Sequence, residues 1–147
     1  MEAIAKAAPL LGRILLALIF FLAGIAKLGD PARTVAMMVS HGIPLPHLLV
    51  FGAIAVEVVG GLMLMVGWHT RLAALVLFFY TLTLALIFHA YWTATGAEAA
   101  TQHALFYGHL SMMGGMLYVF AYGPGPLSVD EAAHSRGAQH FFRLKLR

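Results

Sequence analysis

The sequence contains no cysteine. This absence excludes disulfide bonds, thiolate metal sites and CxxC redox chemistry. A redox role would therefore need a bound cofactor, a quinone, a metal or a partner subunit. Charged residues are also scarce, since they make up only 10% of the 147 residues, whereas an ordinary soluble domain carries roughly 25%. So few charges cannot cover a water-facing surface.

The motifs of common soluble enzymes are absent as well. The chain has no GxGxxG, GxxxxGK[ST], GxSxG or HExxH sequence, which are the signatures of nucleotide-binding and hydrolytic sites. The Gly-Pro-Gly-Pro run at 123–126 is typical of a helix end. The net charge of +3 is explained first by membrane topology, so we predict no nucleic-acid partner.

Apolar residues are abundant. They make up 61% of the chain, and the mean hydropathy is +0.86. Four apolar segments of roughly membrane-spanning length alternate with short loops, and this pattern predicts an all-α integral membrane four-helix bundle with up-down-up-down topology. The first segment is too long for a signal-peptide core, so we expect it to be retained. The segments lie at about Pro9–Leu28, Leu48–Val66, Arg71–Trp92 and Gln102–Tyr122.

The connections complete the predicted organisation. Gly29-Asp30-Pro31 ends the first segment, and Thr34–His41 is predicted to form a short interfacial helix before the second. We divide the chain into a four-helix transmembrane domain at 1–126 and a cytoplasmic basic tail at 127–147. The tail ends in mixed Phe, Leu, Arg and Lys residues, which suit either an anionic membrane face or a disordered tail.

The distribution of Lys and Arg predicts the orientation. With the N-terminus inside, only two of the nine cations fall on the outer side, Lys27 and Arg33. The positive-inside rule therefore places both termini in the cytoplasm. The cations on the inner side are Lys6, Arg13, Arg71, Arg136, Arg143, Lys145 and Arg147.

The second segment carries one carboxylate, Glu57, near its middle, followed one turn later by Gly60 and Gly61. An ionised group at that depth costs several kcal/mol, so it must be paired, protonated or hydrated. The two glycines share a face with Glu57 and allow another helix to approach closely. Glu57 is therefore the residue around which we expect a polar site to form.

Each of the other three segments contributes an ionisable residue to the predicted outer half: Lys27, His89 and His109. Intramembrane ionisable groups usually turn inward and pair. We therefore expect Glu57 and His109 to share an interior site with at least one of Lys27 and His89. Arg13 stands apart near the inner face, where it has a structural or a functional role.

The residues leave several uses of this site open. It forms a structural hydrogen-bond network that fixes helix register, or a pocket in which carboxylate and imidazole groups bind a quinone and move protons. A less favoured reading is an iron or zinc site on Glu57, His89 and His109, and another is a haem between the two histidines. We assign no residue as a metal ligand.

Five short motifs follow one another along the chain: Gly12–Leu28 with its Arg and Lys, Glu57 with Gly60-Gly61, Phe88-His89 with Trp92, His109 with Gly114-Gly115, and Gly123-Pro-Gly with Leu127-Ser-Val-Asp130. In this order they make the chain resemble the DoxX family of small bacterial membrane proteins over about residues 10–130, which implies the inner membrane. The fourth motif departs from the family pattern, because His109 and Leu110 stand where Lys and Asn are common.

The resemblance implies a four-helix membrane protein. Family members are linked to quinone-coupled sulfur oxidation, to detoxification of quinones or oxidants, and to membrane complexes with redox partners. We therefore expect a membrane subunit in quinone-linked redox chemistry or in oxidant detoxification. Whether the chain is itself an enzyme, such as a quinone-linked oxidoreductase subunit, stays open, as do a redox partner protein and a homo-oligomer.

Specific roles follow for five residues. Glu57, His89 and His109 are the candidate catalytic residues, with Glu57 as proton carrier or acceptor and the histidines as donors or relays. Arg13, Lys27, Glu57 and His109 are the candidate residues for binding a quinone. The competing hypotheses are a non-enzymatic scaffold or chaperone-like partner of a redox complex and, less favoured, a small-molecule transporter.

Overall fold

The structure is a computed structural model that describes residues 1–136. This part of the chain is helical throughout and contains no strand, which confirms the predicted all-α class. The basic end of the tail, and the membrane contact predicted for it, lie outside the described residues. The elements are α1 (Glu2–Gly29), α2 (Pro31–Ser40), α3 (Pro46–Ala55), the π-helix η1 (Val56–Gly60), α4 (Gly61–Val66), α5 (Thr70–Phe88), the 3₁₀-helix η2 (Tyr91–Thr93) and α6 (Gly96–Tyr122).

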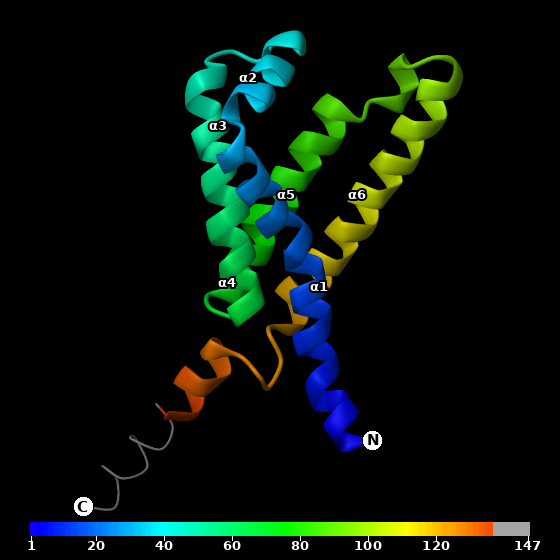
Figure 1. The fold of residues 1–147 in the computed structure, drawn as a ribbon. Helices are drawn as coiled ribbons and strands as arrows, with labels where there is room; N and C mark the ends of the chain where they lie inside the picture. Colours follow the sequence, from blue (N-terminus) through cyan, green and yellow to red (C-terminus); the bar gives the residue numbers. More distant parts are fainter. Residues whose placement is uncertain (137–147) are drawn as a thin grey trace, which may run out of the picture.

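Four helical spans within residues 1–136 are long and apolar enough to cross a membrane: Glu2–Gly29, Pro46–Val66, Thr70–Thr93 and Gly96–Tyr122. In Figure 1 the N-terminus, the α4–α5 turn and the end of α6 lie at one end of the molecule, called the N-terminal end below. Helix α2 and the α5–α6 connection lie at the opposite end. The up-down-up-down topology and the short helix between the first two spans are therefore confirmed.

The helix ends differ from the predicted ones at three places. Helix α1 starts at Glu2 instead of Pro9, and a hydrogen-bonded Lys6–Glu2 pair of 3.0 Å supports the additional turns. Helix α5 ends at Phe88, before the predicted end at Trp92. Helix α6 begins at Gly96 rather than Gln102, because the alanine-rich stretch between them favours helix.

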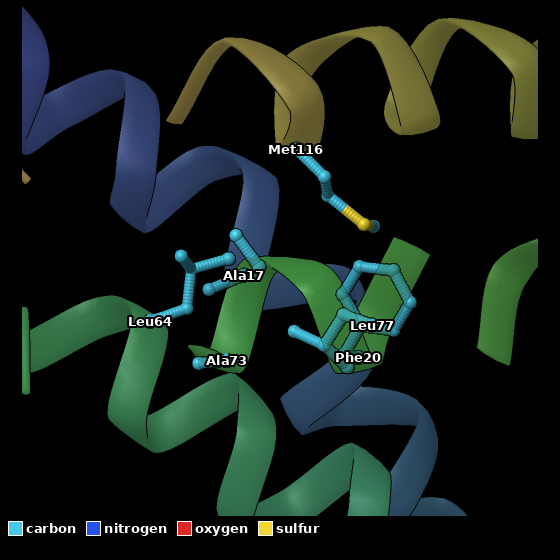
Figure 2. Close-up of a cluster of buried hydrophobic side chains, with 7 residues drawn as sticks. Ala17, Phe20, Leu64, Ala73, Leu77 and Met116 are labelled. Carbon is cyan, nitrogen blue, oxygen red and sulfur yellow. The ribbon is translucent and has the colours of Figure 1, made fainter. Parts of the chain in front are cut away.

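The main buried core lies where α1, α4, α5 and α6 meet. Met116 reaches from α6 toward Leu77 and Phe20 (Figure 2), and α6 packs mainly along α5. A second, smaller core joins α2 to α3 through Met38, Val50, Ala53 and Ile54. The main core consists of Ala17, Phe20, Leu64, Ala73, Ala74, Leu77 and Met116.

Glycines allow α1 to lie directly against η1 and α4. A Cβ atom at Gly24 would come within 2.6 Å of Val58 Cγ2, and one at Gly61 within 3.1 Å of the Phe21 nitrogen. Small residues permit such close backbone approach between membrane helices. The contact at Gly24 is three residues before Lys27, so it brings the end of α1 to the level of Glu57.

Candidate functional site

Glu57 lies at the centre of a three-residue polar cluster. The Lys27 Nζ atom is 2.8 Å from both Glu57 carboxylate oxygens, and the Tyr80 hydroxyl donates to Glu57 Oε1 at 2.7 Å. The Glu57 side chain is only 2% exposed and that of Lys27 is 21% exposed. The cluster joins three separate spans, through α1, η1 and α5. An intramembrane carboxylate is thus paired with a cation and hydrogen-bonded, as its cost requires.

The backbone that carries Glu57 is a π-helix, η1, inserted between α3 and α4. Such single-turn insertions in α-helices are rare and occur frequently at functional sites. The wider turn shifts the register of the side chains that follow it. Glu57 and Gly60 are both buried here, with Glu57 toward Lys27 and Gly60 against Leu77 of α5. The local geometry therefore fits η1 between its two neighbours.

An apolar cavity of about 530 Å³ lies beside this cluster. Lys27 and Tyr80 line it, so the two partners of Glu57 face the cavity while the carboxylate stands behind them. Ligand pockets in proteins typically measure about 300–1,000 Å³ and carry a few placed polar groups in an apolar wall. The other lining residues are Thr34, Met37, Met38, Ile43, Leu49, Gly52, Ala53, Val56, Thr83, Leu84, Ile87, Phe88 and His89.

The wall of the cavity is partly exposed. Three of its lining side chains are each about 40% exposed: Met37, Leu49 and Ile87. These residues come from α2, α3 and α5, so the opening lies between these three helices.

The two predicted site histidines form a second cluster, where the end of α5 lies beside the middle of α6. The rings of His89 and His109 have their centroids 4.6 Å apart. His89 Nδ1 is 2.8 Å from Gln102 Oε1, and His109 Nδ1 is 2.8 Å from the carbonyl oxygen of Leu105. His89 also lines the cavity, and it is the member that connects the two clusters.

Arg13 is buried near the N-terminal end, far along α1 from Lys27, and is 2% exposed. Its guanidinium donates to the carbonyl oxygens of Met65 at 3.3 Å, of Leu127 at 2.8 Å and of Pro124. Met65 lies in the last turn of α4, where carbonyl groups lack helical partners. Arg13 thus ties α1 to α4 and to the segment after α6, and it also lines a separate cavity of about 500 Å³.

Asp130 also lies at the N-terminal end of the molecule, at the start of α5. Its carboxylate accepts from the His69 and Thr70 backbone N–H groups at 2.8 and 2.9 Å and from the Thr70 hydroxyl at 2.7 Å. Burial opposes ionisation of Asp130, but these hydrogen bonds outweigh it and hold the pKa of the carboxyl below its ordinary value. Asp130 therefore caps the start of α5 with the segment that follows α6.

The structure divides the predicted site residues into three groups. It brings Glu57 and Lys27 into direct contact, and it brings His89 and His109 together, while Arg13 lies elsewhere. Within residues 1–136 no group of three or more His, Cys, Asp or Glu side chains is placed to hold a metal ion, so the three-ligand set that includes Glu57 is not assembled.

Sequence reasoning missed two contributors. Tyr80 was one of several polar residues in a strongly apolar segment, and only the fold shows that it meets Glu57. Gln102 was interpreted as the start of a span, whereas it lies inside α6 and contacts His89. A hydroxyl in the middle of an apolar span was the available signal for Tyr80, since such groups usually face a partner.

Comparison with known proteins agrees with this architecture. A family model described as DoxX matches residues 8–90. The chain is 36% identical over 121 residues to "Inner membrane protein YphA" of Escherichia coli strain K12, covering 82% of this chain and 86% of the relative. It is 33% identical over 132 residues to "Inner membrane protein YqjF" of the same organism, covering 86% and 92%. No solved structure matches the chain.

The fold and the buried charges define an integral membrane protein built as a four-helix bundle with a polar cluster inside. The family model covers more than half of the chain, and both relatives are matched over most of their length. The chain belongs to the DoxX family, which confirms the resemblance found in the sequence.

Proposed function

We propose that this protein is a quinone-binding membrane subunit in redox chemistry or in the detoxification of quinones and oxidants. The observation that carries the proposal is the apolar cavity whose wall presents Lys27 and Tyr80, both held by the buried carboxylate of Glu57. A quinone ring is flat and apolar and has two carbonyl oxygens that accept hydrogen bonds. The ammonium can donate its remaining N–H to one of these oxygens, and the Tyr80 hydroxyl can do so by turning its single proton from Glu57 to the quinone.

In this proposal the cluster of Lys27, Glu57 and Tyr80 supplies protons to the quinone. Reduction of a quinone takes up two electrons and two protons at its oxygens. The chain has no cysteine, so a redox partner or a bound cofactor supplies the electrons. Tyr80 and Lys27 stand between Glu57 and the cavity, so Glu57 takes and returns protons through them. General acid–base groups of this kind contribute typically about 10²–10⁴-fold to a rate.

His89 extends this path. It lines the cavity, and its ring lies against that of His109 in the middle of α6. Because a neutral imidazole ring has one nitrogen that donates and one that accepts a proton, the pair suits a relay that leads protons to or from the cavity. Arg13 has no part in this path, because its donors are turned to backbone carbonyl groups at the N-terminal end.

Quinone binding tests the proposal. Equilibrium dialysis of the protein in a mild detergent measures the Kd of a short-tailed ubiquinone. Tyr80→Phe and Glu57→Gln should each raise the Kd about tenfold or more, equivalent to about 1.4 kcal/mol. Tyr122→Phe is the matched control, since Tyr122 is exposed and does not line this cavity. Unchanged binding in both site variants, with helical content preserved, contradicts the proposal and favours a structural network.

The proposed location is the inner membrane, with both termini in the cytoplasm. It rests on the charge distribution and on the names of the two relatives. Because the chain has no cysteine, single cysteines can report orientation without background. A membrane-impermeant maleimide added to intact spheroplasts should label Ala97→Cys and leave Ala3→Cys unlabelled until lysis. The reverse pattern contradicts the orientation.

A further inference from the structure

The two-histidine cluster at the end of α5 has features that the quinone proposal does not use. Each ring is fixed through its Nδ1 atom, by Gln102 Oε1 for His89 and by the Leu105 carbonyl oxygen for His109. Both partners are oxygen acceptors, so each Nδ1 carries the proton. In the neutral rings the lone pair is then on Nε2.

Both Nε2 atoms are available to a ligand. Within residues 1–136 the hydrogen bonds of the two rings involve Nδ1 alone. The same part of the chain holds no buried side-chain nitrogen or oxygen without a hydrogen-bond partner. Neither histidine is among the fully exposed residues. Each Nε2 is therefore open to a small ligand although its ring is partly buried.

This arrangement matches the surroundings of metal-bound histidine. Such residues almost always donate their other ring N–H to a carboxylate, a backbone carbonyl or a similar acceptor, which fixes the tautomer and the ring orientation. His89 and His109 each have such an acceptor already in place. The backbone of His89 is fixed as well, because its N–H donates to Ala85 and its carbonyl accepts from Tyr91 at 2.8 Å.

The spacing of the rings fits a shared ion. Two imidazoles that bind one ion through Nε2 at about 2.0–2.1 Å have ring centroids about 4.5–5.5 Å apart for bond angles between roughly 90° and 120°. The observed separation is 4.6 Å, with the ring planes 46° apart. Two protein nitrogens leave the remaining coordination positions to water or to another small ligand.

We propose that His89 and His109 form a binding site for one divalent transition-metal ion of the kind that prefers imidazole nitrogen, Cu²⁺ or Zn²⁺. Both ligands are histidine Nε2 atoms, and Gln102 and the Leu105 carbonyl are the outer partners that orient them. The site is separate from Glu57 and needs no bound quinone, but an ion on both Nε2 atoms takes the lone pairs that the proposed proton relay would use. His89 also lines the cavity, so an ion bound here lies next to it.

The test uses the full chain without an affinity tag, in a mild detergent. Isothermal titration with Zn²⁺ should give one ion per chain, and His89→Leu and His109→Leu should each weaken binding at least 30-fold. His41→Leu is the matched control: its Nδ1 is also bound to a backbone carbonyl, that of Met37 at 2.9 Å, but its ring neighbour is Phe88 rather than a histidine. This variant should bind as the wild type does.

Two further variants separate this site from its surroundings. Gln102→Leu should weaken binding about 10–100-fold, as the loss of an outer partner does. Glu57→Gln should leave metal binding unchanged even where quinone binding is lost. If Gln102 served only the fold, Gln102→Leu would not lower the affinity for Zn²⁺ in a protein whose helical content is unchanged.

A measurement on the unaltered protein keeps the test independent of folding. Electron paramagnetic resonance of the Cu²⁺-loaded wild type should show hyperfine coupling to two imidazole nitrogens. Coupling to one nitrogen, or unchanged titration in both His89→Leu and His109→Leu, overturns the proposal. So does an equal loss in His41→Leu, because the binding would then be unspecific.

Discussion

Removing the cation of the buried pair should destabilise the protein more than removing any exposed charge. In Lys27→Met the Glu57 carboxylate loses both 2.8 Å contacts and keeps only the hydrogen bond from Tyr80. Glu57 is 2% exposed, so its carboxylate is left without a cation in largely apolar surroundings. Breaking a buried ion pair by removing one partner costs about 3–5 kcal/mol. We expect that loss in the free energy of unfolding.

Two further variants isolate the cause. Lys27→Met combined with Glu57→Gln removes the unpaired charge while keeping an acceptor for Tyr80, so the double variant should lose only about 1–2 kcal/mol. Lys6→Met is the matched control: the Lys6–Glu2 pair is exposed, and such pairs contribute about 0–1 kcal/mol. Unfolding by sodium dodecyl sulfate in mixed micelles at pH 7, followed by circular dichroism, measures all four proteins.

Two results would refute this reasoning. If Lys27→Met loses less than about 1 kcal/mol, the pair behaves as an exposed one and Glu57 is not confined as the structure has it. If the double variant is as unstable as the single one, the loss comes from packing of the methionine side chain and the charge is not its cause.

The remaining predictions concern the ends and the helix contacts. Asp130→Asn should reduce the stability of the folded protein at neutral pH. The pKa of Asp130 is lowered in the folded protein, so the ionised carboxylate stabilises the fold above the ordinary carboxyl range. This stabilisation is lost as the pH falls through the lowered pKa. The stability of the wild type and of this variant, measured by denaturant titration, should therefore converge in acid; a constant difference contradicts the assignment. Gly24→Ala should destabilise the protein because its Cβ would meet Val58, whereas Gly52→Ala has open space and should be neutral or stabilising by up to about 1 kcal/mol. Equal thermal unfolding of these two variants would show that α1 does not approach η1 closely.

The sequence was sufficient for the class of fold because lipid leaves few alternatives. A span must satisfy its own backbone groups, so apolar segments of sufficient length can be interpreted as helices and short loops as reversals. The ends were less predictable, since no apolar pattern marks them. The turns before Pro9 and before Gln102 are helical through local propensity and an exposed ion pair.

The site was predictable in its members and less so in its contacts. A partner for Glu57 was predictable in kind, because a buried carboxylate in a span needs one, but the sequence left open whether Lys27 or His89 joined it. Depth alone placed His109 with them, but depth does not say which way a side chain points around its helix. The π-helix η1 changes the direction of the side chains within the second span, and no sequence pattern predicted it.

The contacts of Arg13 could not be predicted from the sequence either. An arginine in a membrane span suggested a structural or a functional role, and its partners could not be known in advance. They are backbone carbonyls that become free where α4 and α6 end. Its assignment to quinone binding stays a prediction that the hydrogen bonds do not support.

Native mass spectrometry of the protein released from a mild detergent tests the central claim, that the cavity beside Lys27, Glu57 and Tyr80 holds a quinone. Gly52→Leu adds a side chain to the cavity wall, at a position where a Cβ meets nothing within 4 Å. Gly108→Leu is the matched control: a Cβ there also meets nothing within 4 Å, but the position is exposed on α6 and outside this cavity. The account predicts a quinone mass on the wild type and on Gly108→Leu that is absent from Gly52→Leu. A bare wild-type mass, or a quinone retained equally by Gly52→Leu, would contradict it.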